Sequence, residues 1–460
     1  MTSFYVENFG CRATQADGAA IERQFQERGL ARASAAAQSE IVILNTCTVT
    51  ASADQDARAA IRRIRRENPD CQIIVTGCYA QRAPEEVASL PGVTRVIGNS
   101  HKHRLAEIVA ASHRRDEVAG IPVGSSFVPL SSLTPETQSD IYVSDIFAHT
   151  ELLAAPVFDA AVPGTHADRT RPNLKVQDGC DNRCSFCVIP YVRGQSRSLP
   201  LLQALCEANA LVHSGYREIV ISGINLGRWG RDLVRPLRFE DLVYEILAQT
   251  NLEKLRISSV EPMDWSDELI RMMADSSRIA KHAHVPMQSG SDRVLRAMHR
   301  KYRPWHYREK LEKIRAAMPT AAIGADVMVG FPGESESDFE ATRRLIEELP
   351  LTYLHVFTYS ARPGTAAAGL RGQVPVQTAR QRSRVLRDLA TEKKWAFMRG
   401  FVGKTLDAIT LNVFDGDSTE ALTDNYLKLR LAGQHEGNRW VQALVERVDV
   451  GALTAVGVVL

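Results

Sequence analysis

From residue 172 onward the chain alternates between short apolar runs and helix-like stretches, and this alternation constrains the fold more than any other feature. The runs that predict strands are Leu174–Gln177, Glu218–Ser222, Lys254–Ser259, Ala283–Met287, Ala325–Val329 and Tyr353–Tyr359. Helix patterns fall between them, near 200–214, 239–250, 266–276, 291–300, 305–318 and 336–348. Strands that alternate with helices form parallel β/α units. Six units in one domain predict a complete or partial barrel, which carries its chemistry at the C-terminal ends of the strands.

The N-terminal part of the chain shows the same alternation on a smaller scale. Its strand candidates are Phe4–Val6, Ile41–Leu44, Ile73–Val75 and Arg95–Ile97, and helix candidates lie near 15–28, 52–66 and 103–111. We therefore expect an open α/β domain with a largely parallel sheet over residues 1–112.

The remaining segments differ in composition. Residues 113–165 include the stretch VGSSFVPLSSLTPETQSD, which predicts an extended linker or a flexible insertion, although Ile141–Val143 could pair as a strand. Alternation typical of strands at Thr405–Leu411, Tyr426–Leu431 and Trp440–Val445 predicts a small all-β domain over 398–460. The barrel domain then spans 166–397, and the fold class is α/β.

Cys180, Cys184 and Cys187 directly follow the first predicted barrel strand and form the pattern C-x₃-C-x₂-C. Three thiolates on one tight loop can bind three irons of a 4Fe–4S cubane and leave the fourth iron open to a substrate. A zinc loop is the alternative. Structural zinc sites use a fourth Cys or His, and none lies close by in the sequence. The spacing and the strand context therefore favour a cluster.

Three more cysteines, Cys11, Cys47 and Cys78, each follow a strand candidate of the N-terminal domain. The carboxyl ends of strands in an open α/β sheet form one ligand crevice, so we expect these thiols to converge. Buried core cysteines are the alternative reading. For Cys71, at the start of a strand, and Cys206, in an apolar helical pattern, we expect a core position.

The cysteine loop after the first strand of a partial (βα)₆ barrel resembles the signature of the radical S-adenosylmethionine superfamily. The resemblance implies that the open iron chelates S-adenosylmethionine, which an electron from the cluster cleaves to a 5′-deoxyadenosyl radical. The two cysteine sets, with a C-terminal module similar to a TRAM domain, resemble the methylthiotransferase family over nearly the whole chain. The segments NTCTVT (45–50), GCYAQ (77–81), GCDNRCSFCVIPYVRG (179–194), HVPMQSGS (284–291) and DVMVGFPGE (326–334) resemble most the threonylcarbamoyladenosine tRNA methylthiotransferases. Thr14 departs from the Asn that the family usually has there.

The resemblance implies a tRNA-modifying transferase that adds a methylthio group to C2 of N6-threonylcarbamoyladenosine at position 37. It implies two 4Fe–4S clusters, with all six motif cysteines as catalytic ligands. One S-adenosylmethionine would donate a methyl group to sulfur at the N-terminal cluster, and a second would be cleaved at the barrel cluster. The alternatives are an isopentenyladenosine tRNA substrate, an aspartate of a ribosomal protein, and a zinc-dependent RNA-binding protein without catalysis.

Five residues are candidate contacts for S-adenosylmethionine. Phe186 lies between two cluster ligands, where it would cover the adenine or only shield the cluster. Gly223 ends the second barrel strand, where a missing side chain lets a ligand approach the backbone, unless it only forms a turn. Gln288, Ser289 and Asp326 lie on or after barrel strands, where hydrogen bonding within the core is the alternative.

The formal net charge is only +2, so any tRNA footprint must be local. Basic groups at 62–66, at His299, Arg300, Lys301 and Arg303, and at Lys393, Lys394 and Arg399 are candidates for phosphate contacts, with solvated helix faces as the alternative. Arg193 and Arg197 are candidate contacts for the threonylcarbamoyl carboxylate, with the tRNA backbone or a structural carboxylate as the alternative partner.

The expected partners are the anticodon stem-loop of tRNA and a reduced electron donor such as flavodoxin or ferredoxin. The sequence contains no apolar run long enough to span a bilayer, and MTSFYVENFGCRAT lacks the basic and apolar regions of a signal peptide. We therefore expect a cytoplasmic protein with no membrane partner.

Overall fold

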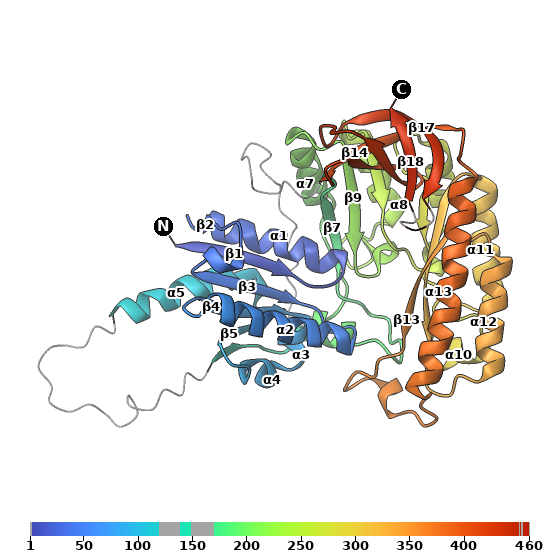
Figure 1. Ribbon diagram of the computed structural model, residues 1–460. Coiled ribbons are helices and arrows are strands. Elements are labelled where there is room, and N and C mark those ends of the chain that lie inside the picture. Colours follow the sequence, from blue (N-terminus) through green and yellow to red (C-terminus); the bar gives the residue numbers. More distant parts are fainter. Residues whose placement is uncertain (1, 119–138, 149–169, 450, 452–453, 460) are drawn as a thin grey trace, which may run out of the picture. The chain divides into compact units, whose positions relative to one another are not determined.

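The computed structural model describes residues 2–118, 139–148, 170–449, 451 and 454–459 (Figure 1). The chain divides into two compact units. The first contains the described residues up to 148 together with 179–181 and 188–197, and the second contains the rest. Most of the predicted linker lies outside the described residues, so its nature stays a prediction.

The first unit is built on a six-stranded, fully parallel sheet with the order β2-β1-β3-β4-β5-β6. Its strands are β1 (Ser3–Asn8), β2 (Ala31–Arg32), β3 (Ile41–Thr46), β4 (Gln72–Gly77), β5 (Val93–Gly98) and β6 (Asp140–Tyr142). Its helices are α1 (Arg12–Gln26), α2 (Ala51–Glu67), α3 (Cys78–Arg82), α4 (Pro84–Ala88), α5 (Leu105–Val118) and α6 (Ile189–Arg193). The predicted strand near 141–143 is confirmed as β6.

Helices cover both faces of this sheet, because each buried strand is apolar on both sides. Ile21 and Phe25 of α1 and Leu105 of α5 pack with one set of strand side chains, which includes Ile41 and Ile43. The opposite face packs against α2, α3 and α4 through a separate cluster (Figure 1). The open parallel α/β domain that the sequence predicts is therefore confirmed.

The second unit contains the six predicted β/α units. Their strands are β7 (Asn173–Asp178), β9 (Glu218–Gly223), β10 (Lys254–Ile257), β11 (His282–His284), β12 (Ala322–Val329) and β13 (Tyr353–Thr358). These strands form two sheets. The first has the order β10-β9-β7-β8, where β8 (Arg197–Ser198) is a short additional strand. The second sheet has the order β11-β12-β13, and a bridge between Ser259 and His284 links the two. The result is a partial parallel barrel.

Helices follow these strands: α7 (Leu201–His213), α8 (Phe239–Gln249), α9 (Asp267–Asp275), α10 (Asp292–Ala297), α11 (Pro304–Ala317) and α12 (Glu336–Glu348). All six agree with the predicted stretches. A further 24-residue helix, α13 (Val376–Arg399), packs against β13 and was not predicted. The predicted core position of Cys206 is wrong, because this residue is exposed on α7.

The chain ends in a closed five-stranded barrel with the order β14-β15-β16-β18-β17. Its strands are β14 (Thr405–Phe414), β15 (Ser418–Thr423), β16 (Lys428–Ala432), β17 (Trp440–Asp449) and β18 (Thr454–Val459). The predicted small all-β module is confirmed. Alternate side chains, among them Ala408, Leu429 and Val445, fill the interior, and Met398 and Phe401 at the end of α13 join this core.

A buried arginine joins this small barrel to the partial barrel. Arg256 on β10 pairs with Glu218 on β9 at 2.7 Å, and neither side chain is exposed to solvent. The same guanidinium donates hydrogen bonds to the carbonyls of Thr423 and Asp424, at 3.0 and 2.9 Å. These carbonyls lie at the end of β15, so one side chain connects two domains of the second unit.

Candidate functional site

The three N-terminal cysteines lie at the carboxyl ends of adjacent parallel strands. Cys11 is the N-cap of α1, Cys47 follows β3, and Cys78 begins α3 directly after β4. Gly10 has a φ of +103°, and a Cβ atom there would lie 2.6 Å from Cys47 Cβ and 2.9 Å from its Sγ. Only glycine lets the chain pass this close, so the sequence brings Cys11 next to Cys47.

The electrostatics of Cys47 show the same convergence. Burial is the main cause that raises the pKa of the Cys47 thiol to about 12, and the neighbouring thiols of Cys78 and Cys11 contribute to the same rise. A thiol in this state is a poor nucleophile, but metal binding removes its proton. Asn99 donates to Cys78 Sγ at 3.5 Å, and Thr14 Oγ1 lies 3.5 Å from Cys11 Sγ. These three free cysteines therefore form a donor set that fits an iron–sulfur cluster.

A buried cationic network adjoins this set. The carboxylate of Asp17 on α1 is paired with both Lys102 and Arg193, each at 3.0 Å, and all three side chains are buried. Lys102 also donates to Asn45 at 3.2 Å, and Arg193 lies 3.4 Å from Thr14 Oγ1. Two cations against one carboxylate leave positive charge beside the cysteines, and Arg193 acts to lower the pKa of Cys47. Arg193 thus has a structural carboxylate as its partner, as one of the sequence alternatives had it.

The second cysteine set lies on the loop between β7 and α6. Cys180, Cys184 and Cys187 are partly exposed, and none of them is disulfide-bonded to a described residue. The Cys187 amide donates to Cys184 O at 3.1 Å, and the Cys180 amide donates to Gly194 O at 3.0 Å. Nowhere in the described ranges do three His, Cys, Asp or Glu side chains surround a point that suits one metal ion. A cubane instead spreads three cysteines over three irons, and three accessible thiols on one loop fit that demand.

Arg300 lies beside this loop, and its predicted contact with a tRNA phosphate is wrong. The residue is only 7% exposed, and a buried guanidinium cannot reach a phosphate. Its Nη1 lies 3.2 Å from Cys184 Sγ, and its Nη2 pairs with Glu261. No sequence signal marked this contact, since Cys184 is 116 residues away in the chain.

Two of the five candidate contacts for S-adenosylmethionine show strong backbone constraints. A Cβ atom on Gly223 would lie 2.7 Å from Gln177 Cβ, so close packing against β7 already requires glycine there. Gln288 has a φ of +62°, a left-handed conformation that non-glycine residues adopt rarely. Its amide donates to Asp326 O at 2.8 Å and its carbonyl accepts from Met328 at 2.9 Å, so β12 holds this turn in place.

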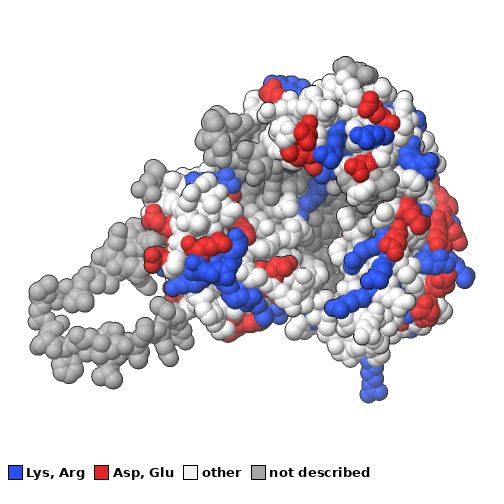
Figure 2. All heavy atoms as spheres, viewed as in Figure 1, with Lys and Arg blue, Asp and Glu red and all other residues white. Residues whose placement is uncertain are grey.

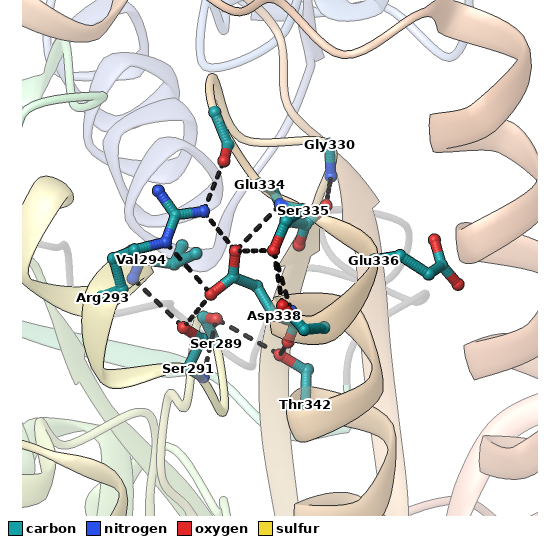
Figure 3. Close-up of polar contacts among 12 residues, drawn as sticks. Ser289, Ser291, Arg293, Val294, Gly330, Glu334, Ser335, Glu336, Asp338 and Thr342 are labelled. Atoms are coloured by element: carbon teal, nitrogen blue, oxygen red, sulfur yellow. Dashed lines mark hydrogen bonds and ion pairs between the residues drawn. The ribbon is translucent and has the colours of Figure 1, made fainter.

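The adjoining loop is fixed by a polar network around Asp338 on α12 (Figure 3). Ser291 donates to the Asp338 carboxylate at 2.6 Å, and Arg293 and Ser335 also bind it. Ser289 is fully buried and lies 3.2 Å from Thr342 Oγ1. Ser289 therefore has a hydrogen-bonding role within the core, and this network orients the loop that carries Gln288.

The other two candidates differ in their surroundings. Phe186 packs with Val294, Met298 and Phe331 in a small apolar cluster beside the cysteine loop. Asp326, in the middle of β12, is partly exposed, and His284 Nε2 lies 3.4 Å from its carboxylate. Asp326 is thus available to a polar ligand in the barrel, whereas Phe186 has the surroundings of a shielding residue.

Basic and acidic side chains are mixed over the face of the molecule that Figure 2 shows. Several candidate phosphate contacts are engaged within the protein. Lys393 donates to the carbonyls of Glu347 and Leu349 at the end of α12, at 3.0 and 2.9 Å, and Arg303 pairs with Asp292 at 3.0 Å.

One row of arginines on α13 is different. Arg380, Arg384 and Arg387 follow one face of the helix at i, i+4 and i+7, and all three are exposed. They form no ion pair with any described residue, whereas Arg343 and Arg344 on α12 are paired with Glu340. We call these three residues the α13 arginine row.

No helix within the described ranges combines the length and apolar character that crossing a membrane requires.

Comparisons with known proteins agree with this geometry. Residues 3–98 match the family described as "Uncharacterized protein family UPF0004", and residues 174–346 match the "Radical SAM superfamily". The chain is 33% identical to "Threonylcarbamoyladenosine tRNA methylthiotransferase MtaB" of Aquifex aeolicus, over 95% of this chain and 99% of the relative. It is 34% identical to the protein of the same name from Bacillus subtilis, over 95% and 92%.

The chain belongs to the radical S-adenosylmethionine methylthiotransferase family. Another relative, "tRNA-2-methylthio-N(6)-dimethylallyladenosine synthase" of Novosphingobium aromaticivorans, is 33% identical over 88% of this methylthiotransferase and 86% of its own length. Among solved structures, the radical S-adenosylmethionine methyltransferase TsrM of Kitasatospora setae superposes with a TM-score of 0.57 and 16% identity, over 80% of this chain and 77% of that one. The predicted family and α/β fold class are therefore confirmed.

Proposed function

We propose that this protein adds a methylthio group to C2 of N6-threonylcarbamoyladenosine at position 37 of tRNA. One observation carries the proposal. The chain aligns with 99% and 92% of the length of two relatives named threonylcarbamoyladenosine tRNA methylthiotransferase, and its sequence contains both cysteine sets. As a transferase of this kind it would bind two 4Fe–4S clusters, one at Cys11, Cys47 and Cys78 and one at Cys180, Cys184 and Cys187, together with S-adenosylmethionine. Its place of action would be the cytoplasm.

The clusters, when bound, would supply the electron that cleaves S-adenosylmethionine and the site at which sulfur is methylated. The chain's own residues do the rest. Gln288, in the turn after β11, and Asp326, within β12, would bind the cofactor, and Phe186 would exclude water from the cysteine loop. Positioning and water exclusion matter here because a primary carbon radical attacks any neighbouring group. A reduced donor such as flavodoxin or ferredoxin would deliver the electron.

The tRNA would bind to the closed C-terminal barrel and to the α13 arginine row. Both belong to the second unit, and residues 400–404 join α13 to β14. Exposed arginines without acidic partners are free to neutralise phosphates, and this electrostatic term dominates affinity for nucleic acids. The reacting adenine must also leave its stack in the anticodon loop.

The isopentenyl substrate is the second candidate, because relatives that act on dimethylallyladenosine are almost equally similar. The two substrates differ in polarity: threonylcarbamoyl carries a carboxylate and a hydroxyl, whereas the isopentenyl group is apolar. Arg197 stays a candidate for the carboxylate contact. Sites built for a polar group reject analogues that lack it.

Nucleoside mass spectrometry of tRNA from cells with and without the gene tests the proposal. We expect the methylthio form of threonylcarbamoyladenosine to disappear without the gene and to return with the wild-type chain. A competition assay with two anticodon stem-loops, one with each N6 group, tests the substrate. Preference for the isopentenyl stem-loop would contradict the assignment, and loss of neither nucleoside would refute the function as a whole.

A further inference from the structure

One buried cation directly contacts a cysteine of the barrel loop. The three nitrogens of the Arg300 guanidinium have three different neighbours: Nη1 lies 3.2 Å from Cys184 Sγ, Nη2 pairs with Glu261, and Nε lies 3.3 Å from Tyr302 Oη. An N–H group donates to a thiolate more strongly when the donor is charged. Arg300 therefore offers Cys184 a charge-assisted hydrogen bond inside the protein.

The segment that carries Arg300 is fastened to the cysteine loop. The Ser185 amide donates to Met298 O at 3.1 Å, and Ser185 Oγ donates to Ala297 O at 2.7 Å. His299 adopts a φ of +57° and its Nδ1 lies 3.1 Å from Arg183 O. These contacts flank Cys184 on both sides, so the loop and the arginine cannot separate without breaking several hydrogen bonds.

The partners of Arg300 are fixed in turn. Tyr302 is buried and its hydroxyl donates to Met287 O at 2.7 Å, which anchors the ring beneath the guanidinium. The Arg300 carbon Cζ lies 5.0 Å from the centre of this ring, a cation–π contact. Glu261 opposes the positive charge, which makes burial of the arginine tolerable. The donor is therefore preorganised before any cluster binds.

Hydrogen bonds to cysteine sulfurs are one of the main ways in which proteins set the reduction potential of an iron–sulfur cluster. Reduction adds negative charge to the cluster and its thiolates, so a positively charged donor stabilises the reduced state more than the oxidised state. We propose that Arg300 is a positioning residue that raises the reduction potential of the barrel cluster through Cys184 Sγ. The inference rests on the proposed function, because it requires a cluster at Cys180, Cys184 and Cys187.

An alternative account is that Arg300 only pairs with Glu261 to stabilise the fold. In that case its removal would alter stability and leave the potential unchanged. The exposed neighbour Lys301 provides a matched control, because it carries the same charge one residue away. Comparison of the two positions separates the hydrogen bond from the loss of one positive charge near the loop.

The test is a redox titration followed by electron paramagnetic resonance. It uses the full chain in a Cys47→Ala background, so that only the barrel cluster contributes a signal, with iron and sulfide analysis of each sample. We compare Arg300→Met, Arg300→Gln, Arg300→Lys and Lys301→Gln with the parent protein. We expect Arg300→Met to shift the equilibrium toward the oxidised cluster by about tenfold, which is about 59 mV for one electron. Arg300→Lys should shift less, and Lys301→Gln least.

A midpoint potential of Arg300→Met equal to that of Lys301→Gln would overturn the inference. If Arg300→Met assembles no cluster, the comparison of Arg300→Gln with Arg300→Lys decides, and a common potential for these two overturns it. Failure of the proposed function gives a different result: the parent protein itself would lack about four irons per chain and its cluster signal.

Discussion

Replacement of Arg256 by methionine should destabilise the second unit strongly. Methionine is unbranched like arginine but shorter, and it carries no charge. Among the described residues, the fully buried Glu218 then keeps the partly exposed Arg171, at 3.4 Å, as its cation. Removal of one partner from a buried pair costs about 3–5 kcal/mol. The two carbonyls of Thr423 and Asp424 also lose their donor. We therefore expect a loss of about 4 kcal/mol, or roughly a thousandfold in the opening equilibrium.

Hydrogen-exchange mass spectrometry of the full chain measures this loss where it occurs, because exchange reports local opening free energies. Peptides that contain β9, β10, β15 and β16 should exchange up to about a thousandfold faster. Peptides from β3 and β4 in the first unit serve as the internal control and should not change. The double variant Arg256→Met/Glu218→Met removes the orphaned charge and should recover about half of the loss, since apolar pairs replace buried ion pairs well. Changes below about tenfold in all four strands, or equal changes in the first unit, would refute the reasoning.

Other outcomes follow from the same structure. Cys184→Ala should abolish release of 5′-deoxyadenosine, because the barrel cluster loses a ligand, and a normal rate would contradict the cysteine assignment. Cys47→Ala should retain 5′-deoxyadenosine formation without methylthiolated product, which nucleoside mass spectrometry detects; full product would exclude a catalytic role for the N-terminal set. Replacement of the α13 arginine row by glutamine should weaken tRNA binding and reduce its salt dependence, whereas loss of the paired Arg343 should change neither; equal effects would argue against the row. Burial opposes ionisation of Glu218, but Arg256 and Arg171 outweigh it and lower its pKa. The contribution of ionised Glu218 to the free energy of unfolding is present above the ordinary carboxyl pKa of 4.5. It is lost as the pH falls through the lower pKa that Glu218 has in the folded protein. The stability difference between wild type and Glu218→Gln should therefore shrink below that pH in urea titrations, and a constant difference would be inconsistent with the pair.

Periodicity predicted most of the fold, because strands and helices of β/α units are local patterns. The exceptions have local causes. The predicted strand Ala283–Met287 ends at His284, because Pro286 cannot donate a ladder hydrogen bond and Gln288 turns into the left-handed region. Helix α13 was missed because its mostly polar sequence buries few side chains, Leu386 among them.

The cysteine sets were predictable because their spacing in sequence and their position after strands are both visible in the chain. The buried arginines were not. Arginine is normally a surface residue. Burial of Arg193 depends on Asp17, 176 residues away in the chain, and burial of Arg300 depends on Glu261, 39 residues away. A cation in the interior is stable only beside such a partner, and no one-dimensional pattern shows which partner folding will supply.

The lengths of the outer strands affect the tendency of the cluster-free protein to aggregate. A long exposed strand at the margin of a sheet invites pairing with another chain and aggregation. In the first unit the two outer strands, β2 and β6, are only two and three residues long. The C-terminal barrel is closed, so its sheet has no edge strand. In a newly made polypeptide that waits for cluster delivery, we therefore expect neither the first unit nor the C-terminal barrel to pair edge to edge with another chain.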